Sequence, residues 1–427
     1  MLIYSERINE RYRMGHKRLV EADQSASYPS FLKKIHNSSK SQPAPDPVVI
    51  KMDKPDAQKQ LQTLIKNSEP QAIVDNYAEQ YAELLLSKNA HLYRANHEVQ
   101  VDSIKNLLDE HYGKADPWTL GAWSYFPWSG QLIHVLNQED FEDLRTIRNR
   151  ELITKSEQAT LLDFSAACFG MSVGSAGALA LAISGISRKI KLIDGAVISG
   201  SNLNRILTGV ESVGTSKAEV IGRKIYEMNP YAQIYRTDKV TAENIETILD
   251  GNCSTNLVID EIDDIEMKVR LRIEARKRKI PVIMASELGD TVILDVERYD
   301  LEPNRPLFHN AIPDIEEVAK NPPENHREWM KYAVKILDPK NMPIKLQKSL
   351  LKIGSTVVTH PQLGATVMMT GGILAFAAKN IALGGALESG RYTISLENML
   401  LADHGTRKHK RAHKKHTKVI SSAMQSM

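Results

Sequence analysis

A glycine turn and an acidic residue further along the chain have the spacing of a nucleotide-binding site. The run GMSVGS, residues 170–175, follows an apolar segment and precedes a stretch rich in Ala and Leu. Glycine lets the backbone turn sharply from a strand into a helix, and the N-terminal amides of the helix then face a phosphate. Asp194 comes 20 residues after Gly174, at the end of the next apolar run, where an acid commonly bonds ribose hydroxyls. We therefore expect Gly170, Ser172, Gly174 and Asp194 to bind a nucleotide, although this degenerate form of G-x-G-x-x-G would alone also suit packing.

The polar residues after this acid indicate a triphosphate. Asn202, Asn204 and Arg205 belong to the run SNLNR, and Lys217 ends the run VGTSK. Arginine makes bidentate contacts with phosphate oxygens, whereas lysine acts as a point charge. Two amides and two cations beyond the ribose position predict bound ATP, with Arg205 and Lys217 neutralising the charge that develops during catalysis.

A third group of polar residues predicts a magnesium ion. The apolar run NLVID leads directly into the acidic residues 260–264, DEIDD. Carboxylates at the carboxyl end of a parallel strand face the ligand crevice and can hold Mg²⁺. We expect Asp263 to position the metal and Asp264 to cap the following helix. Together these residues describe a carboxylate that attacks the α-phosphate of ATP while pyrophosphate leaves.

The elements that must position these side chains alternate along the chain from about residue 148 to 300. Short apolar runs such as KIKLID and PVIMAS alternate with longer stretches of helical periodicity such as SKAEVIGRKIYEMN. This order predicts an α/β fold, Rossmann-like, with a parallel-rich sheet covered by helices on both faces. A smaller α+β module before it and a helical C-terminal extension after it complete the expected architecture.

Taken in order, these motifs resemble the ThiF/MoeB/HesA family, the bacterial relatives of the ubiquitin-activating enzymes. In that family an acidic strand end is followed by S-N-L-x-R, V-G-x-x-K and a second acidic strand end. The matching positions here are Asp194, residues 201–205, residues 213–217 and residues 260–264. The resemblance implies ribose binding by Asp194, phosphate contacts by Asn202, Arg205 and Lys217, and a Mg²⁺-associated role for Asp263.

The resemblance also implies a homodimer. The segment RNR, residues 148–150, resembles an entry segment in which an arginine reaches ATP across a dimer interface, and Arg150 is the better match. The flanking segments resemble a subgroup with a G-[LM]-S-V-G turn, some members of which are fused to a nitroreductase-like domain. The implied activity is ATP-dependent adenylation of a carboxylate: the C-terminus of a peptide or small carrier protein, or a small acid.

Two departures from the family pattern bear on mechanism. Ala196 stands where the family has a second acid. Members that form thioesters carry a cysteine well after the metal aspartate, but residues 254–427 contain none. Cys168 suits a small core residue and Cys253 lies in a polar turn, so we expect an external nucleophile to capture the acyl adenylate.

Other functions remain open at this point. Ala196 and the irregular turn suit a catalytically weak ATP-binding sensor or scaffold. An NAD- or FAD-binding Rossmann oxidoreductase would use the same fold, although the SNLNR and VGTSK runs argue against it. RNA modification through an adenylated intermediate is a further alternative.

The chain divides into five expected parts. Three tryptophans between residues 117 and 135 predict a hairpin that packs on the core, and His360 is expected to be a structural loop residue. The parts are a polar segment and linker (1–54), an α+β module (55–140), the adenylation domain (141–310), a mostly helical part (311–401) and a basic disordered tail (402–427).

The charge of the chain is unevenly distributed. The net charge is +3, but seven Lys and Arg residues lie between Arg407 and Lys418, so the rest carries −4. Such a tail attracts RNA or another polyanion, or is simply solvated. The N-terminus lacks a signal-peptide pattern, and the apolar run of residues 363–378 suits a buried helix better than a membrane span. We expect a cytoplasmic protein without a membrane contact.

Overall fold

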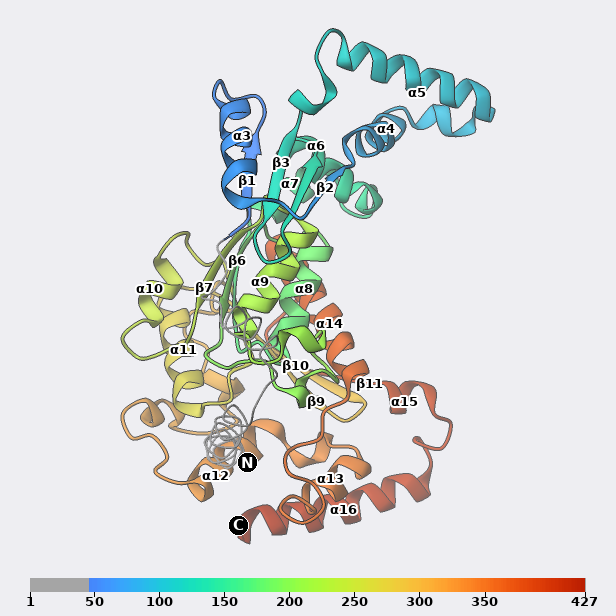
Figure 1. Cartoon of the computed structure of the whole chain (residues 1–427). Helices are drawn as coiled ribbons and strands as arrows, with labels where there is room; N and C mark the ends of the chain where they lie inside the picture. The colour runs from blue at the N-terminus through green and yellow to red at the C-terminus, as the bar shows by residue number, and fades with distance from the viewer. Residues whose placement is uncertain (1–45, 427) are drawn as a thin grey trace, which may run out of the picture.

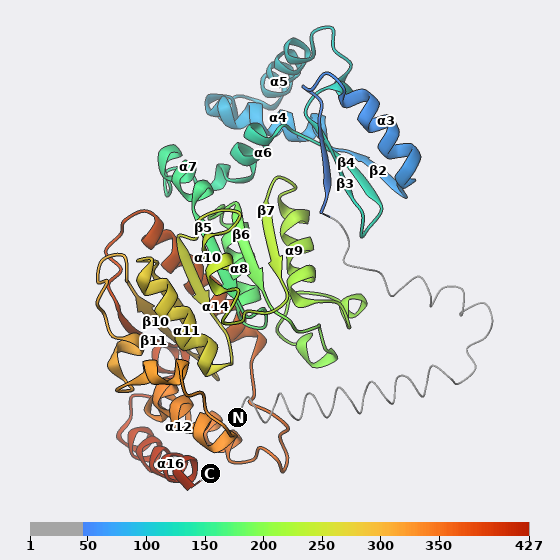
Figure 2. The same ribbon diagram turned by 90° about the vertical axis from the view of Figure 1, so that its left-hand side faces the viewer.

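A seven-stranded sheet forms the centre of the protein (Figures 1 and 2). The structure, a computed structural model, describes residues 46–426. The strand order is β11-β10-β9-β8-β5-β6-β7. The five strands from β9 to β7 are parallel to one another, whereas β10 pairs antiparallel with both of its neighbours, β9 and β11. The strands are β5 (Ser165–Phe169), β6 (Lys189–Ile193), β7 (Gln233–Thr237), β8 (Leu257–Asp260), β9 (Val282–Leu288), β10 (Thr291–Glu297) and β11 (Gly390–Ser395). The expected parallel-rich α/β fold is confirmed.

Helices cover both faces of this sheet because its strands are apolar on both sides. In β5, Ala166 and Cys168 face one core cluster, whereas Ala167 and Phe169 face the other. Such continuous burial is typical of parallel strands between two helical layers. The first layer contains α8 (Gly174–Ile183), α9 (Lys217–Met228) and α14 (Gly364–Ala382), and the second contains α10 (Ile245–Asp250), α11 (Ile265–Lys277) and α12 (His326–Leu337).

The apolar run near residue 370 forms helix α14, which packs along α8 in the first layer (Figure 1). A Cβ on Gly371 would lie 2.6 Å from the carbonyl oxygen of Ala176, so a glycine is required at this close approach. Among the described residues, α14 is the one helix long and apolar enough to cross a membrane, and half of its apolar window is buried in this fold.

A second, four-stranded sheet forms the N-terminal module, at the top of Figure 1, with order β1-β3-β4-β2. The predicted hairpin is confirmed, since β3 and β4 are antiparallel neighbours. One element begins earlier than expected: β1 pairs with β3 although it lies in the range assigned to a linker. The module contains β1 (Val48–Lys51), α3 (Ala57–Ser68), β2 (Ala72–Asp75), α4 (Tyr77–Lys88), α5 (His97–Tyr112), β3 (Ala122–Phe126), β4 (Gln131–Val135) and α6 (Gln138–Arg145). The next helix, α7 (Lys155–Asp163), belongs to the large domain, because its Leu161 lies in the first core cluster.

The three tryptophans of the hairpin region have different roles. Trp128 reaches the large domain, where its indole N–H donates to Glu227 Oε1 on α9 at 2.9 Å. Trp123 is buried within the module, and Trp118 is 40% exposed. The expected packing between module and core is therefore made by Trp128.

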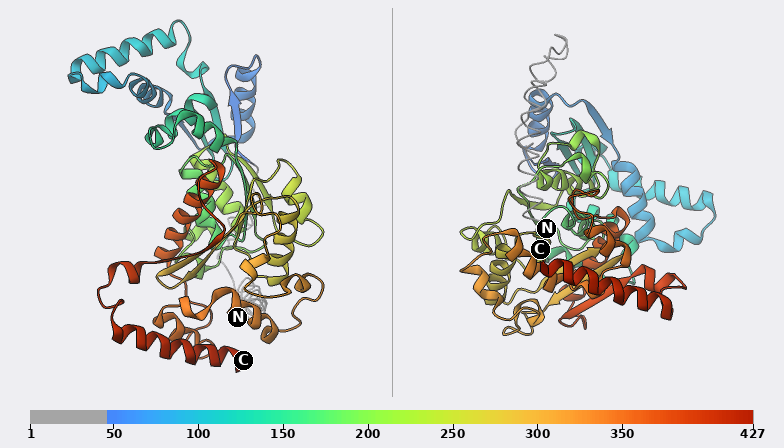
Figure 3. Two further views of the ribbon diagram at one scale, coloured as in Figure 1. Left: turned by 180° about the vertical axis from the view of Figure 1, so that it is seen from behind. Right: turned by 90° about the horizontal axis from the view of Figure 1, so that it is seen from below.

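The C-terminal residues differ from expectation. The basic segment was expected to be disordered, but residues Arg407–Ser426 form helix α16, which packs on α12 and α13 (Figure 3). Thr417 bonds to Gln347, and Ile420 is only 2% exposed, so one face of the helix is held by the fold. The remaining elements of this part are α13 (Ile344–Leu350) and α15 (Leu396–Leu400).

Candidate nucleotide site

The turn after β5 presents the N-terminus of α8 at the carboxyl edge of the parallel strands. Gly170 has φ +86°, and a Cβ there would clash with the carbonyl oxygen of Glu261, so only glycine fits. Its amide donates to Ile193 O at 2.8 Å, which holds the turn against β6. Gly174 is the first residue of α8. The positive end of the helix dipole therefore lies at this edge, where an anion would be stabilised. Ligands of such sheets bind outside the carboxyl ends of the strands, and this region is called the predicted crevice, or crevice, below.

Asp194, directly after β6, holds this turn from the side. Its Oδ2 accepts from the Met171 amide at 2.6 Å, and its Oδ1 accepts from the Ala196 amide at 2.6 Å. The Nζ of Lys217 lies 3.9 Å from Oδ2. Each carboxylate oxygen has a further lone pair, so Asp194 can hold the turn and still accept from a ribose hydroxyl.

Arg205 is brought to the glycine turn by the loop that contains it. Its Nε donates to Ser172 Oγ at 3.1 Å, and its Nη1 donates to Ser201 O and Asn204 Oδ1 at 3.0 and 2.9 Å. Three contacts fix the guanidinium over the N-terminus of α8. Residues 172 and 205, which lie 33 positions apart, thus meet at the turn where the sequence analysis expects phosphate.

The two amides of the SNLNR run have different surroundings. Asn202 is buried, and its side-chain oxygen accepts from the Ser199 amide at 3.0 Å, so it shapes the loop. The Nδ2 of Asn204 donates to Gln362 O at 3.0 Å and joins the loop to the segment before α14. A Cβ on Gly364 would clash with the Asn204 carbonyl oxygen, which shows how closely the two segments approach.

Lys217 is the first residue of α9, and its amide donates to Ala196 O at 2.9 Å. Its side chain is 12% exposed. Lys217 and Asp194 therefore lie side by side at the carboxyl edge of the parallel strands.

The acidic residues after β8 divide between structure and crevice. Asp260 is fully buried and pairs with Arg272 and Lys268, and Asp264 caps α11 by accepting from the Met267 amide, as predicted. Asp263 is exposed, and its charge acts on Arg205. Asp263 is therefore an exposed aspartate of this group that lies near Arg205.

The donors present suit a magnesium ion that is held partly by phosphates. Within residues 46–426 there is no group of three or more His, Cys, Asp or Glu side chains that could hold a metal alone. Mg²⁺ in nucleotide sites is commonly bound through one or two carboxylates together with substrate phosphates. Asp263 beside the phosphate-facing turn meets that requirement.

Arg150 does not join this constellation within its own chain. Its Nη2 pairs with Asp143 at 2.7 Å. The preceding residue, Asn149, bonds to Ser184 O at the C-terminal end of α8, whereas the crevice lies at the N-terminal end of that helix. The side chain therefore lies at the opposite edge of the sheet.

Sequence reasoning missed a carboxylate in the crevice wall. Glu287 lies near the end of β9, is 6% exposed, and accepts from Gln362 Nε2 at 3.0 Å. Its Oε1 is buried with no hydrogen-bond partner among the described residues. Burial raises the pKa of Glu287 to about 7, Gln362 and Arg205 act to lower it, and Asp263 raises it further. The sequence signal that could have identified Glu287 is that it is the one acidic residue in the otherwise largely apolar run VIMASEL, residues 282–288.

His360 lies beside the same residues. Burial, reinforced by the positive charge of Arg205, lowers the pKa of His360 to about 4. The imidazole is therefore neutral at physiological pH. It adds no cation to the crevice.

The cysteines lie outside the crevice. Cys168 is fully buried within β5, where burial raises the pKa of its thiol to about 12. Cys253 contacts Ser165 Oγ at 3.3 Å, at the opposite end of β5 from the glycine turn. Neither is placed to attack an acyl adenylate.

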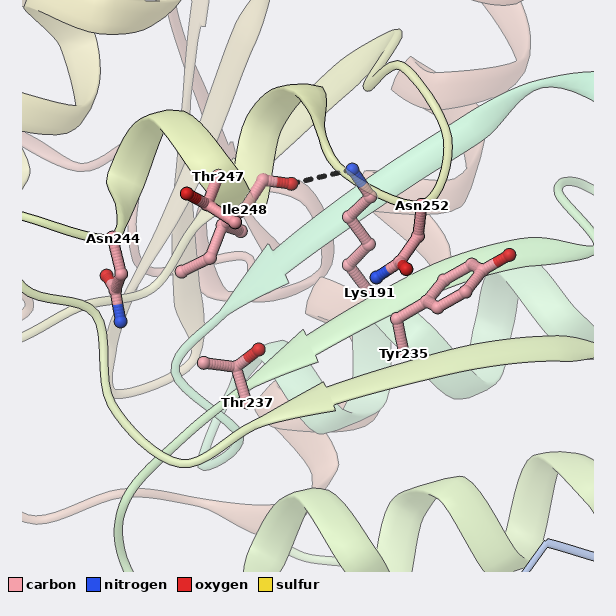
Figure 4. A pocket seen from close by; sticks show the side chains of 7 residues that line it. All are labelled: Lys191, Tyr235, Thr237, Asn244, Thr247, Ile248 and Asn252. Carbon is pink, nitrogen blue, oxygen red and sulfur yellow. Dashed lines mark hydrogen bonds between the residues drawn. The ribbon is translucent and has the colours of Figure 1, made fainter.

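A separate hollow of about 140 Å³ lies beside β6 and β7 (Figure 4). Lys191 reaches its wall, but the ammonium donates to the carbonyl oxygens of Ile248, Leu249, Gly251 and Cys253 at the C-terminal end of α10. Burial lowers the pKa of Lys191. The lysine thus caps a helix, and this hollow contains none of the predicted nucleotide ligands.

The fold and the crevice define a Rossmann-like nucleotide-binding protein. The model of the ThiF family matches residues 145–418, and the chain belongs to that family. It is 34% identical over 279 residues to the uncharacterized protein MT1398 of Mycobacterium tuberculosis, covering 65% of this chain and 38% of that protein. It is 34% identical over 122 residues to the tRNA threonylcarbamoyladenosine dehydratase of Escherichia coli, covering 28% of this chain and 44% of that enzyme.

The chain thus spans less than half the length of these two relatives. Among solved structures, the same Escherichia coli dehydratase in complex with AMP aligns with a TM-score of 0.38 at 22% identity, covering 57% of this chain and 93% of that one. The crystal structure of selenomethionine PaaA aligns with a TM-score of 0.41 at 20% identity, covering 61% of this chain and 78% of that one.

Proposed function

We propose that this protein is an adenylyltransferase that transfers AMP from ATP to a carboxylate. A carboxylate oxygen of the substrate attacks the α-phosphorus, the bond from that phosphorus to the bridging oxygen breaks, and pyrophosphate leaves. The observation that supports this most strongly is the contact of Arg205 with Ser172, which fixes a cation over the phosphate-facing helix N-terminus. Membership of the ThiF family favours this activity over a nicotinamide- or flavin-dependent oxidoreductase.

Each crevice residue has a defined part in this reaction. The amides at the start of α8 bind phosphate oxygens, and Asp194 accepts from the ribose. Arg205 and Lys217 neutralise the charge that develops on the phosphates as pyrophosphate departs. Asp263 and the phosphates would hold Mg²⁺, which would supply further charge neutralisation.

The acyl adenylate is then captured by an external nucleophile. Cys168 is fully buried and Cys253 lies at the other end of β5, so no thioester relay is available to them. The substrate classes that fit are the C-terminus of a peptide or small carrier protein, or a small acid. We place the reaction in the cytoplasm and propose no membrane contact for it.

Exchange of labelled pyrophosphate into ATP tests the first half-reaction. The assay contains Mg²⁺ and one carboxylate source at a time. The sources are each free amino acid and a pool of random-sequence peptides with free C-termini. The same peptide pool with amidated C-termini is the matched control. We expect exchange with one carboxylate source, none with the amidated pool, and loss of exchange in Arg205→Ala. Absence of exchange with every carboxylate, together with absence of ATP binding, contradicts the proposal.

We further propose that Arg150 completes the site of a second copy in a homodimer. Alone, it lies at the far edge of its own sheet and pairs with Asp143. Mixing Arg150→Ala and Arg205→Ala chains should restore about one quarter of wild-type exchange, because half of randomly mixed dimers have one complete site. Activity that stays at the level of the separate variants contradicts a contribution from the partner.

A further inference from the structure

Helix α16 carries a continuous cationic face. All seven of its Lys and Arg side chains are exposed, and none makes an ion pair with any residue of the described range 46–426. Residues 404–427 contain no Asp or Glu that could neutralise them. At 1.5 Å per residue, the charges extend along about 16 Å of helix. The residues are Arg407, Lys408, Lys410, Arg411, Lys414, Lys415 and Lys418.

The opposite face of α16 is attached to the protein. His413 Nε2 lies 3.0 Å from Met342 O, and Thr417 Oγ1 accepts from Gln347 Nε2 at 3.1 Å. Ile420 is part of the core beneath α11 and α12. Ile420 is thus used for packing, and the fold supports the cations from the opposite face of the helix.

This support lies below the central sheet, at the opposite end of the molecule from the N-terminal module (Figure 1). Helix α13, on which α16 packs, approaches the turn between β9 and β10: a Cβ on Gly289 would lie 3.7 Å from Pro343 and 3.9 Å from Leu346. The carbonyl of Gly289 also accepts from Thr366 Oγ1 of α14 at 2.7 Å. Gly289 is two residues after Glu287, so a ligand on α16 would lie on the edge of the sheet where the crevice opens.

We propose that the exposed face of α16 binds the phosphate backbone of a nucleic acid. A line of unpaired Lys and Arg side chains on a straight helix matches the regular charges of a phosphate backbone. A helix that binds a membrane surface needs an exposed apolar face, whereas among the described side chains of α16 Val419 is the one large apolar residue that is exposed. Because the contacts are to phosphates, RNA and DNA strands of the same sequence should bind similarly.

Fluorescence anisotropy with the full chain tests this surface. The probes are 5′-labelled 20-nucleotide RNA and DNA strands, titrated at 50 to 200 mM KCl. For the wild type, four released counterions would give a slope of roughly −3 when the logarithm of the binding constant is plotted against the logarithm of the salt concentration. A variant with four of the cations replaced should bind at least about tenfold more weakly and show a flatter slope. The variant replaces with Gln four cations of the exposed face: Lys410, Arg411, Lys414 and Lys415.

A matched variant separates this surface from general charge. It removes the same number of exposed cations from the N-terminal module and should bind like the wild type; its substitutions are Lys59→Gln, Lys66→Gln, Lys105→Gln and Lys114→Gln. Equal melting temperatures show that both variants fold. Binding that is unaffected by the α16 substitutions, equally weakened by the control, or seen only with phosphatidylserine vesicles overturns the proposal.

Discussion

Replacing Glu287 with Gln should stabilise the protein at alkaline pH. The Glu287 carboxyl is 6% exposed and one of its oxygens has no hydrogen-bond partner among the described residues. Its pKa is raised by burial from 4.5 to about 7 in the folded protein. The raised pKa means that the folded state resists ionisation, whereas the unfolded chain ionises above about pH 4.5.

The size of the effect follows from this difference. Each unit of pKa corresponds to about 1.4 kcal/mol, so full ionisation destabilises the fold by about 3 kcal/mol. Below about pH 4.5 both states are protonated and this contribution of the carboxyl is intact. It is lost progressively as the pH rises through about 7, and the advantage of the neutral Gln then reaches its maximum.

Melting temperatures of wild type and Glu287→Gln, measured from pH 5 to pH 8.5, test this expectation. The difference should be small at pH 5 and grow to roughly 5 °C at pH 8.5. Glu110→Gln, on the exposed surface of α5, is the control and should show a constant difference. A difference for Glu287→Gln that does not change with pH, or a variant less stable than wild type at pH 8.5, would show that Arg205 stabilises the carboxylate more than burial disfavours it.

Three further predictions concern the core and the chemistry. Arg272→Met should cost about 3–5 kcal/mol and lower the melting temperature markedly, because buried Glu297 would lose its ion pair and buried Asp260 would keep only Lys268; an unchanged melting temperature contradicts this. Replacing Cys168 and Cys253 together with Ala should leave pyrophosphate exchange intact, whereas loss of exchange in a folded variant would reinstate a cysteine mechanism. EDTA should abolish exchange and added Mg²⁺ should restore it; exchange that persists in EDTA argues against a role for Asp263 in metal binding.

The parts of the site that lie near strand ends could be predicted from the sequence. The positions of Gly174 and Asp194 follow from apolar runs that end in polar residues, because parallel strands bring their carboxyl ends to one edge. The motif order also assigned Arg205 and Ser172 to the same nucleotide, and the structure brings the two side chains into contact. These residues belong to consecutive strand–helix units, so local order determines their meeting.

Contacts between distant segments could not be predicted in this way. Glu287 and Gln362 lie 75 residues apart, and their bond depends on how α14 packs against the sheet. The helical C-terminus was missed because a run of like charges resembles a disordered tail. The docked face of α16 is made by His413, Thr417 and Ile420, a pattern with too few apolar residues to indicate packing.

Calorimetric titration of ATP with Mg²⁺ into wild type, Arg205→Ala and Lys217→Ala tests the central claim most directly. Lys224→Ala, on the same helix as Lys217 but paired with Glu227, is the matched control. A contact with a charged group contributes about 1.5–3 kcal/mol, so each crevice variant should bind ATP roughly tenfold to a hundredfold more weakly, while the control binds normally. Wild-type affinity in both crevice variants would contradict a triphosphate held by Arg205 and Lys217.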